Sequence, residues 1–291
     1  MKAGHVRVST VFGGPGARGN LTATVFCDTA PNPDLARDLA STLTFPETGF
    51  LWPAGKANRS YNLMSQSPLE ELSYCTQTLL AAGEWLQSGK DPGAARIKQV
   101  RTQKGEIIIR DENDPTVFWT STTAVTPRVI DVFEISPLWP PPLTGSYPLM
   151  RIACGRTRLV QQFNSLEQLY ELAPTPDDIL AVCKVYECQG LSVFYRGQAE
   201  HIHARVFTTS LGGAEDLGTG GAAVAMAAYL ESTGSPLGCG AHVVIEQGAL
   251  AIGKGQIFLR VASSGVFIGG RVTPVLDGQL LGSSAKLGND R

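Results

Sequence analysis

Apolar and polar positions alternate along this chain in short runs, a pattern typical of many strands and few helices. Apolar β-branched runs predict strands at 6–12 and 21–26, whereas leucines spaced four residues apart predict a helix at 32–43. Further helices are predicted at 165–172 and 176–182. Other extended segments are predicted at 50–52, 106–110, 116–119, 150–154, 159–163, 191–196, 204–208, 242–247, 257–262 and 265–268.

Two helical segments differ from the rest because they carry almost no polar face. Residues 77–86 and 221–230 consist mainly of small and apolar side chains, which implies burial on all sides. They lie about half a chain length apart, and a polar turn precedes each one, at 73–76 and 215–220. We therefore predict an α+β fold with two similar domains, each a curved mixed β-sheet or barrel wrapped around a central helix.

A proline-rich stretch separates the two halves. Residues 135–148 contain five prolines in fourteen positions, which excludes a helix and removes ladder donors from any strand. We predict an N-terminal domain at 1–135, a linker at 136–148 and a C-terminal domain at 149–291.

Composition and charge exclude several classes of function. The 291 residues include 24 Lys and Arg against 26 Asp and Glu, so the formal charge of −2 provides no basic field for nucleic acid or an anionic membrane. No apolar run reaches the roughly 18 residues of a membrane span, and the first residues lack the apolar core of a signal peptide. We expect a cytoplasmic protein that binds neither nucleic acid nor membranes.

Cysteine and histidine spacing does not predict a metal site. The six cysteines form no CxxC pair, which argues against a disulfide scaffold and a zinc ribbon and favours reduced, buried thiols. His201 and His203 have the period-2 spacing that places both rings on one face of a strand, where they could supply two metal ligands. Because no carboxylate or thiol pattern nearby completes a site, we interpret them as strand-face histidines and predict no metal.

The turns before the two apolar helices indicate a binding site. A buried helix N-terminus presents unsatisfied N–H groups and the positive end of the helix dipole, so it can hold an anion without a lysine. Two such termini facing a cleft would form a pocket for a small acid. The alternative is that Glu215, Asp216 and Thr219 only cap the second helix, as their residue types allow.

The motifs at these turns resemble those of a known family. The chain is similar to the PhzF-like family, phenazine-biosynthesis-type isomerases that share the two-domain fold of diaminopimelate epimerase. Residues 45–50 (FPETGF) resemble the family's SETTF segment, and 215–222 (EDLGTGGA) resemble its EDPxTGSA signature. Further similar segments occur in the family's order at 8–12, 19–23, 71–82, 193–197, 203–207, 228–230, 247–248, 253–255 and 266–270.

The resemblance implies roles for individual residues. Glu47 takes the place of the family's general acid and base, and Asp216 that of the signature aspartate, which orients the substrate. Gln77 stands where the family has the histidine of its GHP turn, Thr76 replaces the preceding glycine, and Gly221 replaces the signature serine. These departures imply a substrate different from the phenazine precursor.

The surroundings of Glu47 are compatible with this role on physical grounds. The apolar residues 50–52 that follow it could desolvate its carboxyl group and raise its pKa, although the alternative is an ordinary exposed loop glutamate. Epimerases of the same fold use one thiol at each turn. Here Cys75 lies at the first turn and Asp216 at the second, which argues against racemisation. Cys75 is interpreted as a packing residue or a partner of Glu47.

We therefore hypothesise a cofactor-independent isomerase that moves a proton between carbons of a small conjugated carboxylate, in a specialised-metabolite (antibiotic) pathway such as one for dihydroanthranilate- or 4-alkylproline-type compounds. Glu47 would carry the proton, Thr76, Gln77 and Asp216 would contact polar groups, and the backbone N–H groups of Thr219, Gly220, Gly221 and Ala222 would hold the carboxylate. The resemblance also implies a homodimer. The alternatives are a catalytically impaired binding protein and a dehydratase or tautomerase on the same fold.

Overall fold

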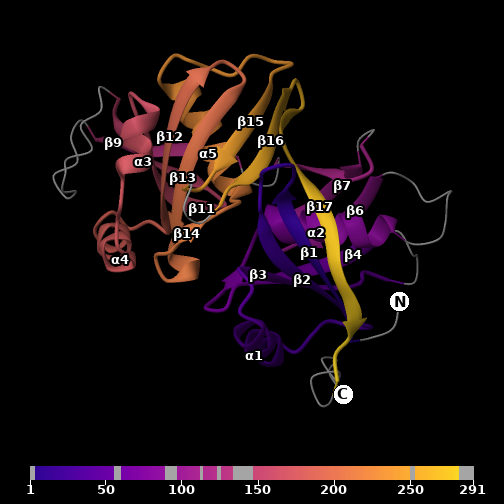
Figure 1. Cartoon of the computed structure of the whole chain (residues 1–291). Coiled ribbons are helices and arrows are strands. Elements are labelled where there is room, and N and C mark those ends of the chain that lie inside the picture. The colour runs from indigo at the N-terminus through magenta and orange to yellow at the C-terminus, as the bar shows by residue number, and fades with distance from the viewer. Residues whose placement is uncertain are drawn as a thin grey trace.

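The protein folds into two lobes, each built of strands around one central helix (Figure 1). This arrangement is seen in a computed structural model that describes residues 4–55, 60–88, 97–111, 114–122, 126–133, 147–249 and 253–281. The strands of both lobes are connected by hydrogen bonds into one continuous sheet system. Among the described helices, none is both long and apolar enough to cross a membrane.

The N-terminal lobe encloses α2 (Thr76–Gln87). Thr76 through Leu86 are all buried, as the nearly uniform apolar sequence predicts. Helix α1 (Pro33–Leu43) lies outside this lobe and is capped by the Asn32 side chain, which accepts hydrogen bonds from two backbone N–H groups. The strands are β1 (His5–Gly13), β2 (Asn20–Phe26), β3 (Glu47–Pro53), β4 (Ser60–Gln66), β5 (Glu71–Leu72), β6 (Ile97–Thr102), β7 (Gly105–Asp111) and β8 (Val117–Ser121).

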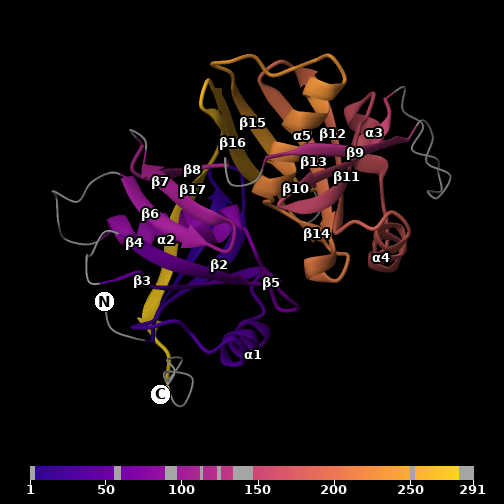
Figure 2. The same ribbon diagram turned by 180° about the vertical axis from the view of Figure 1, so that it is seen from behind.

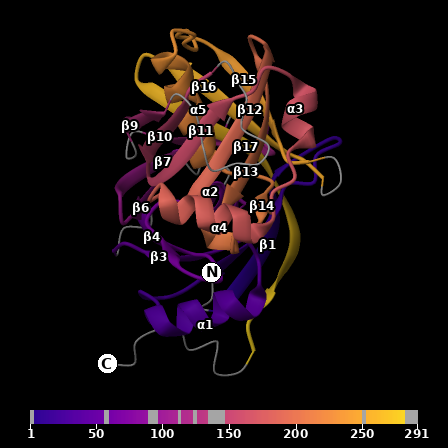
Figure 3. The ribbon, with the colours of Figure 1, turned by 90° about the vertical axis from the view of Figure 1, so that its left-hand side faces the viewer.

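The C-terminal lobe encloses α5 (Gly220–Ser232), whose small side chains let strands approach the helix closely. At its far end, the buried Tyr229 donates a hydrogen bond of 2.6 Å to the carbonyl oxygen of Pro148. Helices α3 (Leu166–Glu171) and α4 (Pro176–Val185) lie on the outside of this lobe (Figure 3). The strands are β9 (Arg128–Phe133), β10 (Leu149–Cys154), β11 (Arg156–Gln162), β12 (Gly190–Gln198), β13 (His201–Thr208), β14 (Glu215–Asp216), β15 (His242–Gln247) and β16 (Gly255–Ala262).

The predicted fold class is confirmed, because each apolar helix is the centre of its lobe and strands surround it (Figure 2). Val11, Leu79, Ile152 and Val224 are fully buried members of the same core cluster, so one apolar core extends through both lobes.

Strand pairing crosses the predicted domain limits twice. β9 precedes the proline-rich stretch, yet it pairs with β10 and so joins the C-terminal lobe. The last strand, β17 (Gly265–Gln279), pairs with β16 at its start and with β1 over most of its length, so it returns the chain to the N-terminal lobe. Most of the predicted linker, residues 136–146, lies outside the described residues.

Candidate active site

A small cavity lies where the N-termini of α2 and α5 meet between the lobes. Its volume is about 40 Å³. The two helices approach so closely that a Cβ atom on Gly220 would lie 2.1 Å from the Thr76 hydroxyl oxygen. The lining residues are Glu47, Leu72, Tyr74, Cys75, Thr76, Gln77, Cys154, Gly155, Arg156, Arg158, Asp216, Gly218, Thr219, Gly220 and Gly221.

The N-terminus of α5 presents fewer free N–H groups than the sequence suggests. Thr219 donates its backbone N–H to Gln247 Oε1 at 3.2 Å, and Ala222 donates to the Thr219 carbonyl oxygen at 3.0 Å. Ala222 is also absent from the cavity lining. Gly220 and Gly221, the other two residues expected to hold a carboxylate, both line the cavity.

Asp216 is buried, and each of its carboxylate oxygens accepts hydrogen bonds from the protein. Asn20 Nδ2 donates to Oδ1 at 2.6 Å, and the Thr219 hydroxyl donates to Oδ2. The Gly218 N–H adds a longer bond of 3.4 Å to Oδ1. Such a set of donors fixes the orientation of the carboxylate.

The three residues considered as caps of α5 do not cap it with their side chains. Thr219 occupies the N-cap position without a side-chain hydrogen bond to the helix. The Asp216 carboxylate accepts hydrogen bonds from the turn that precedes the helix. Glu215 instead forms a bidentate pair with Arg205, at 2.9 Å and 2.7 Å. The helix N-terminus is thus kept open toward the cavity.

Gln77, which replaces the family histidine, belongs to a buried network. Its Oε1 accepts from Asn20 Nδ2 at 2.8 Å, and its Nε2 donates to the Thr22 hydroxyl at 2.7 Å. Asn20 therefore connects Gln77 of the N-terminal lobe to Asp216 of the C-terminal lobe. Gln77 is held in one orientation at the first turn of α2, beside Thr76.

Glu47 begins β3 and is 8% exposed, so it is a buried strand residue rather than an exposed loop glutamate. Its Oε2 atom is buried without a hydrogen-bond partner among the described residues. Burial raises the pKa of this carboxyl well above its ordinary value, and the negative charge of Asp216 adds to the rise, while Arg156 and Arg158 oppose it. A raised pKa allows a carboxyl to hold a proton in the folded protein and to act as either acid or base.

Arg156 and Arg158, which were not predicted from the sequence as site residues, also line the cavity. Arg158 is 4% exposed, and its Nε and Nη1 atoms have no hydrogen-bond partner among the described residues. Burial lowers its pKa to about 10, with the charge of Arg156 in the same direction, so it remains a cation at neutral pH. Because buried nitrogen donors without hydrogen-bond partners are costly, this group is suited to an anionic ligand. The sequence signal is the Arg-Thr-Arg run in β11.

Two thiols also face the cavity, whereas the sequence indicated only Cys75. Cys75 is the N-cap residue of α2, and Cys154 ends β10. Burial raises the pKa of each thiol to about 12, so both are neutral at ordinary pH. Within the described residues, no three lining groups are arranged as a metal-ligand cluster.

The similarity to known proteins covers nearly the whole chain. A predicted epimerase from Pseudomonas aeruginosa is 20% identical with a TM-score of 0.77, covering 96% of this chain and 99% of that chain. A phenazine biosynthesis protein of the PhzF family from Bacillus anthracis is 17% identical with a TM-score of 0.77, covering 97% and 100%. A probable proline racemase from Agrobacterium radiobacter is 11% identical with a TM-score of 0.66, covering 95% and 92%.

These structures share the fold of this chain, which is that of PhzF-family and epimerase-type proteins. No curated protein matches the sequence significantly. The sequence profile described as phenazine biosynthesis-like protein (PhzC-PhzF) matches residues 10–278, and the chain therefore belongs to this family.

Proposed function

We propose that this protein is a cofactor-independent isomerase that moves a proton between two carbons of a small unsaturated carboxylate, with Glu47 as acid and base. The observation that carries this proposal is the buried, unpartnered Oε2 of Glu47 in the cavity between the two helix N-termini. Its raised pKa, caused by burial and by Asp216, makes the ionised form a strong base.

The proposed proton transfer needs no reactant other than the substrate and Glu47. The ionised Glu47 takes a proton from a carbon of the substrate, so the C–H bond breaks and an O–H bond forms. The electron pair enters the conjugated system and moves the double bond. Glu47 then returns the proton to a different carbon on the same face, which regenerates its carboxylate.

The arginines support an acidic substrate. Arg158 has two buried nitrogen atoms without partners among the described residues, and Gly220 and Gly221 place backbone N–H groups at the same cavity. Together they would bind the substrate carboxylate and stabilise the negative charge that develops when the proton leaves. Asp216 acts as a positioning residue, since both of its oxygens are held by the protein.

The size of the cavity implies that the lobes separate to admit the substrate. Its volume of about 40 Å³ is well below the roughly 300–1,000 Å³ of typical ligand pockets. A site that closes around the substrate also excludes water, which strengthens every charge interaction inside it. A specialised-metabolite pathway of the dihydroanthranilate or 4-alkylproline type, and a homodimeric assembly, stay predictions.

A second candidate is a two-thiol epimerase, favoured by Cys75 and Cys154 at the same cavity. Burial raises the pKa of both thiols to about 12, so very little thiolate is available as a base at neutral pH. The pKa of a glutamate is also raised by burial, but it starts about four units below that of a cysteine. Glu47 is therefore the preferred proton carrier.

The test is isomerisation in D₂O of a cyclohexadiene carboxylic acid of the dihydroanthranilate type, followed by NMR for both double-bond position and deuterium. Glu47→Gln keeps the size of the side chain but cannot exchange a proton. We expect the rate to fall by about 10² to 10⁴, the usual contribution of a general base.

Glu84→Gln is the matched control, since Glu84 is equally buried at 8% exposure but pairs with Arg7 and does not line the cavity. Its rate should equal that of the parent protein. Isomerisation that survives in Glu47→Gln but is abolished in Cys75→Ser and in Cys154→Ser would replace the proposed mechanism with the two-thiol one.

A further inference from the structure

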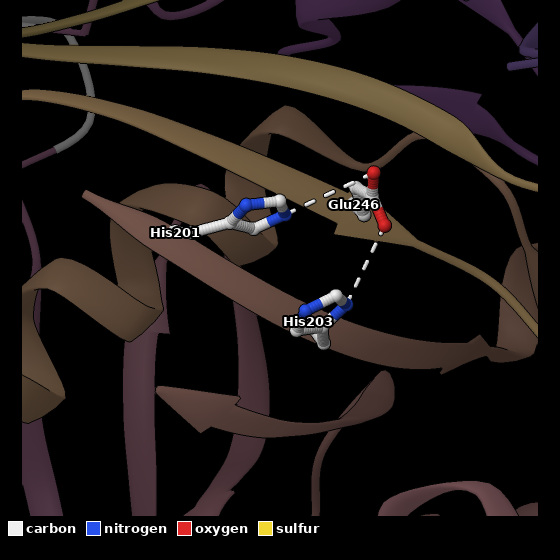
Figure 4. Close-up of side chains that lie close together, drawn as sticks. All are labelled: His201, His203 and Glu246. Atoms are coloured by element: carbon white, nitrogen blue, oxygen red, sulfur yellow. Dashed lines mark ion pairs between the residues drawn. The ribbon is translucent and has the colours of Figure 1, made fainter. Parts of the chain in front are cut away.

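A second cluster of chemically active side chains lies on the outer face of the C-terminal lobe. β13 and β15 run parallel, and their register places His203 directly beside Glu246. His201 lies two residues earlier on the same face of β13, so its ring stacks on that of His203 at 4.6 Å and 15°. Figure 4 shows the Glu246 carboxylate beside both imidazoles, with one ion pair to each. None of the three residues lines the cavity of Glu47.

The distances within this cluster are close to those of a coordination sphere. His201 Nε2 lies 3.8 Å from Glu246 Oε1, and His203 Nδ1 lies 3.5 Å from Glu246 Oε2. One ligand atom from each residue lies within 4.8 Å of the other two. Ligand atoms about 2.0–2.1 Å from a tetrahedral metal are roughly 3.3–3.4 Å apart, so small side-chain rotations suffice to close the sphere.

We propose that His201, His203 and Glu246 form a binding site for a divalent transition-metal ion of the Zn²⁺ type, with water as the remaining ligand. Two imidazoles and one carboxylate are a ligand set that Zn²⁺ uses in proteins. The side chains are 36%, 22% and 28% exposed, respectively, so an ion can reach them from solvent.

One nitrogen atom of the cluster has no hydrogen-bond partner among the described residues. This atom is the buried Nε2 of His201. An imidazole nitrogen without a hydrogen-bond partner is available as a ligand for a metal ion.

Lys254 is the group that a metal ion would have to displace. Its Nζ donates a hydrogen bond of 2.8 Å to Glu246 Oε2 and lies 5.6 Å from the ring centre of Tyr170. The Tyr170 hydroxyl in turn lies 3.5 Å from His203 Nδ1. The ammonium group and the metal compete for the same carboxylate, so this competition distinguishes binding at Glu246 from binding elsewhere.

The experiment titrates Zn²⁺ into the full-length chain by calorimetry, after removal of bound metal with a chelator. The parent carries Cys239→Ser, because Cys239 is the exposed thiol and could bind zinc by itself. We expect one Zn²⁺ per chain. His203→Asn, His201→Asn and Glu246→Gln should each weaken binding by at least about tenfold, since even indirect partners of metal ligands contribute that much. Co²⁺ bound in the same place should give visible absorption bands of a tetrahedral site.

Two further variants make the result decisive. His242→Asn changes an exposed histidine of β15 outside the cluster and should leave Zn²⁺ affinity unchanged. Lys254→Met removes the competing charge and should tighten binding by roughly fivefold, the effect of one unit charge about 4 Å away in a water-like dielectric. Melting temperatures in the presence of a chelator show that each variant is folded.

Absence of a 1:1 complex would overturn the proposal. So would equal affinities of the parent, His203→Asn and His201→Asn proteins, or an affinity that does not increase in Lys254→Met, because each result would place zinc away from Glu246.

Discussion

The residues proposed to carry the chemistry are titratable or charged groups buried away from solvent. Glu47 keeps an unpartnered oxygen atom inside the protein, and Arg158 keeps two unpartnered nitrogen atoms, in each case among the described residues. Buried polar atoms without partners destabilise a fold, so several of them at one cavity are consistent with a ligand that completes their interactions. A substrate with a carboxylate and a removable proton, as proposed above, would supply both partners.

The raised pKa of Glu47 has a consequence for stability. The folded chain holds this proton to a higher pH than the unfolded chain, where the pKa is about 4.3. Between these two pKa values the folded state binds more protons, so stability is lost as the pH rises. We predict that Glu47→Gln gains stability relative to the parent as the pH rises above about 5, by up to about 1.4 kcal/mol per pH unit.

Urea denaturation of both proteins over this pH range measures the effect. The difference between their free energies of unfolding isolates Glu47 from the other titrating groups. If the free energies of unfolding of the two proteins changed with pH in parallel, the fold would not hold Glu47 in its protonated form.

Among the elements, the contact between the starts of α2 and α5 positions the site. Gly220 has no room for a Cβ atom beside Thr76, so Gly220→Ala must move the two helices apart. We predict a loss of about 1–3 kcal/mol in the free energy of unfolding, typical of overpacking, together with reduced turnover. Chemical denaturation and the isomerisation assay measure these two effects.

Gly221→Ala is the control for this prediction. A Cβ atom there would meet only the Cys154 carbonyl oxygen, at 3.7 Å, which is an ordinary contact. Its stability should stay within about 1 kcal/mol of the parent, because alanine is favoured over glycine in a helix. If both substitutions had the same effect, the helix contact would not be the cause.

At the scale of the whole molecule, an ion pair joins the lobes at the edge of the cavity. Arg156 of β11 donates to Glu70, in the turn before β5, at 2.8 Å. Glu70 is 43% exposed, so the pair contributes no more than about 1 kcal/mol. We predict that Glu70→Gln lowers kcat/KM by up to about fivefold, because the closed arrangement is less favoured.

The free energy of unfolding should change little in Glu70→Gln. A lower kcat/KM would then result from weaker closure of the lobes and not from unfolded protein. Asp34→Asn is the control, since Asp34 pairs with Arg37 within α1, on a single lobe. An unchanged kcat/KM in Glu70→Gln would show that this ion pair does not influence closure.

The sequence by itself was sufficient to predict the two central helices, because a helix without a polar face must be buried on all sides. It also indicated Glu47 and Asp216, since both lie in short motifs with a recognisable order. It did not predict β4, β6, β9 or the two-residue strands β5 and β14, and it predicted β17 only at its apolar start. The remainder of β17 is largely exposed, so its strand conformation depends on the hydrogen bonds to β1.

Only the tertiary structure brought together groups that are distant in the chain. Arg158 reaches the cavity from β11, and Asn20 connects Gln77 to Asp216 across the lobes. Glu246 lies more than forty residues after His203, and the parallel pairing of β13 with β15 alone makes them neighbours. Periodicity reports which face a side chain occupies, whereas the pairing of distant strands decides which side chains share that face.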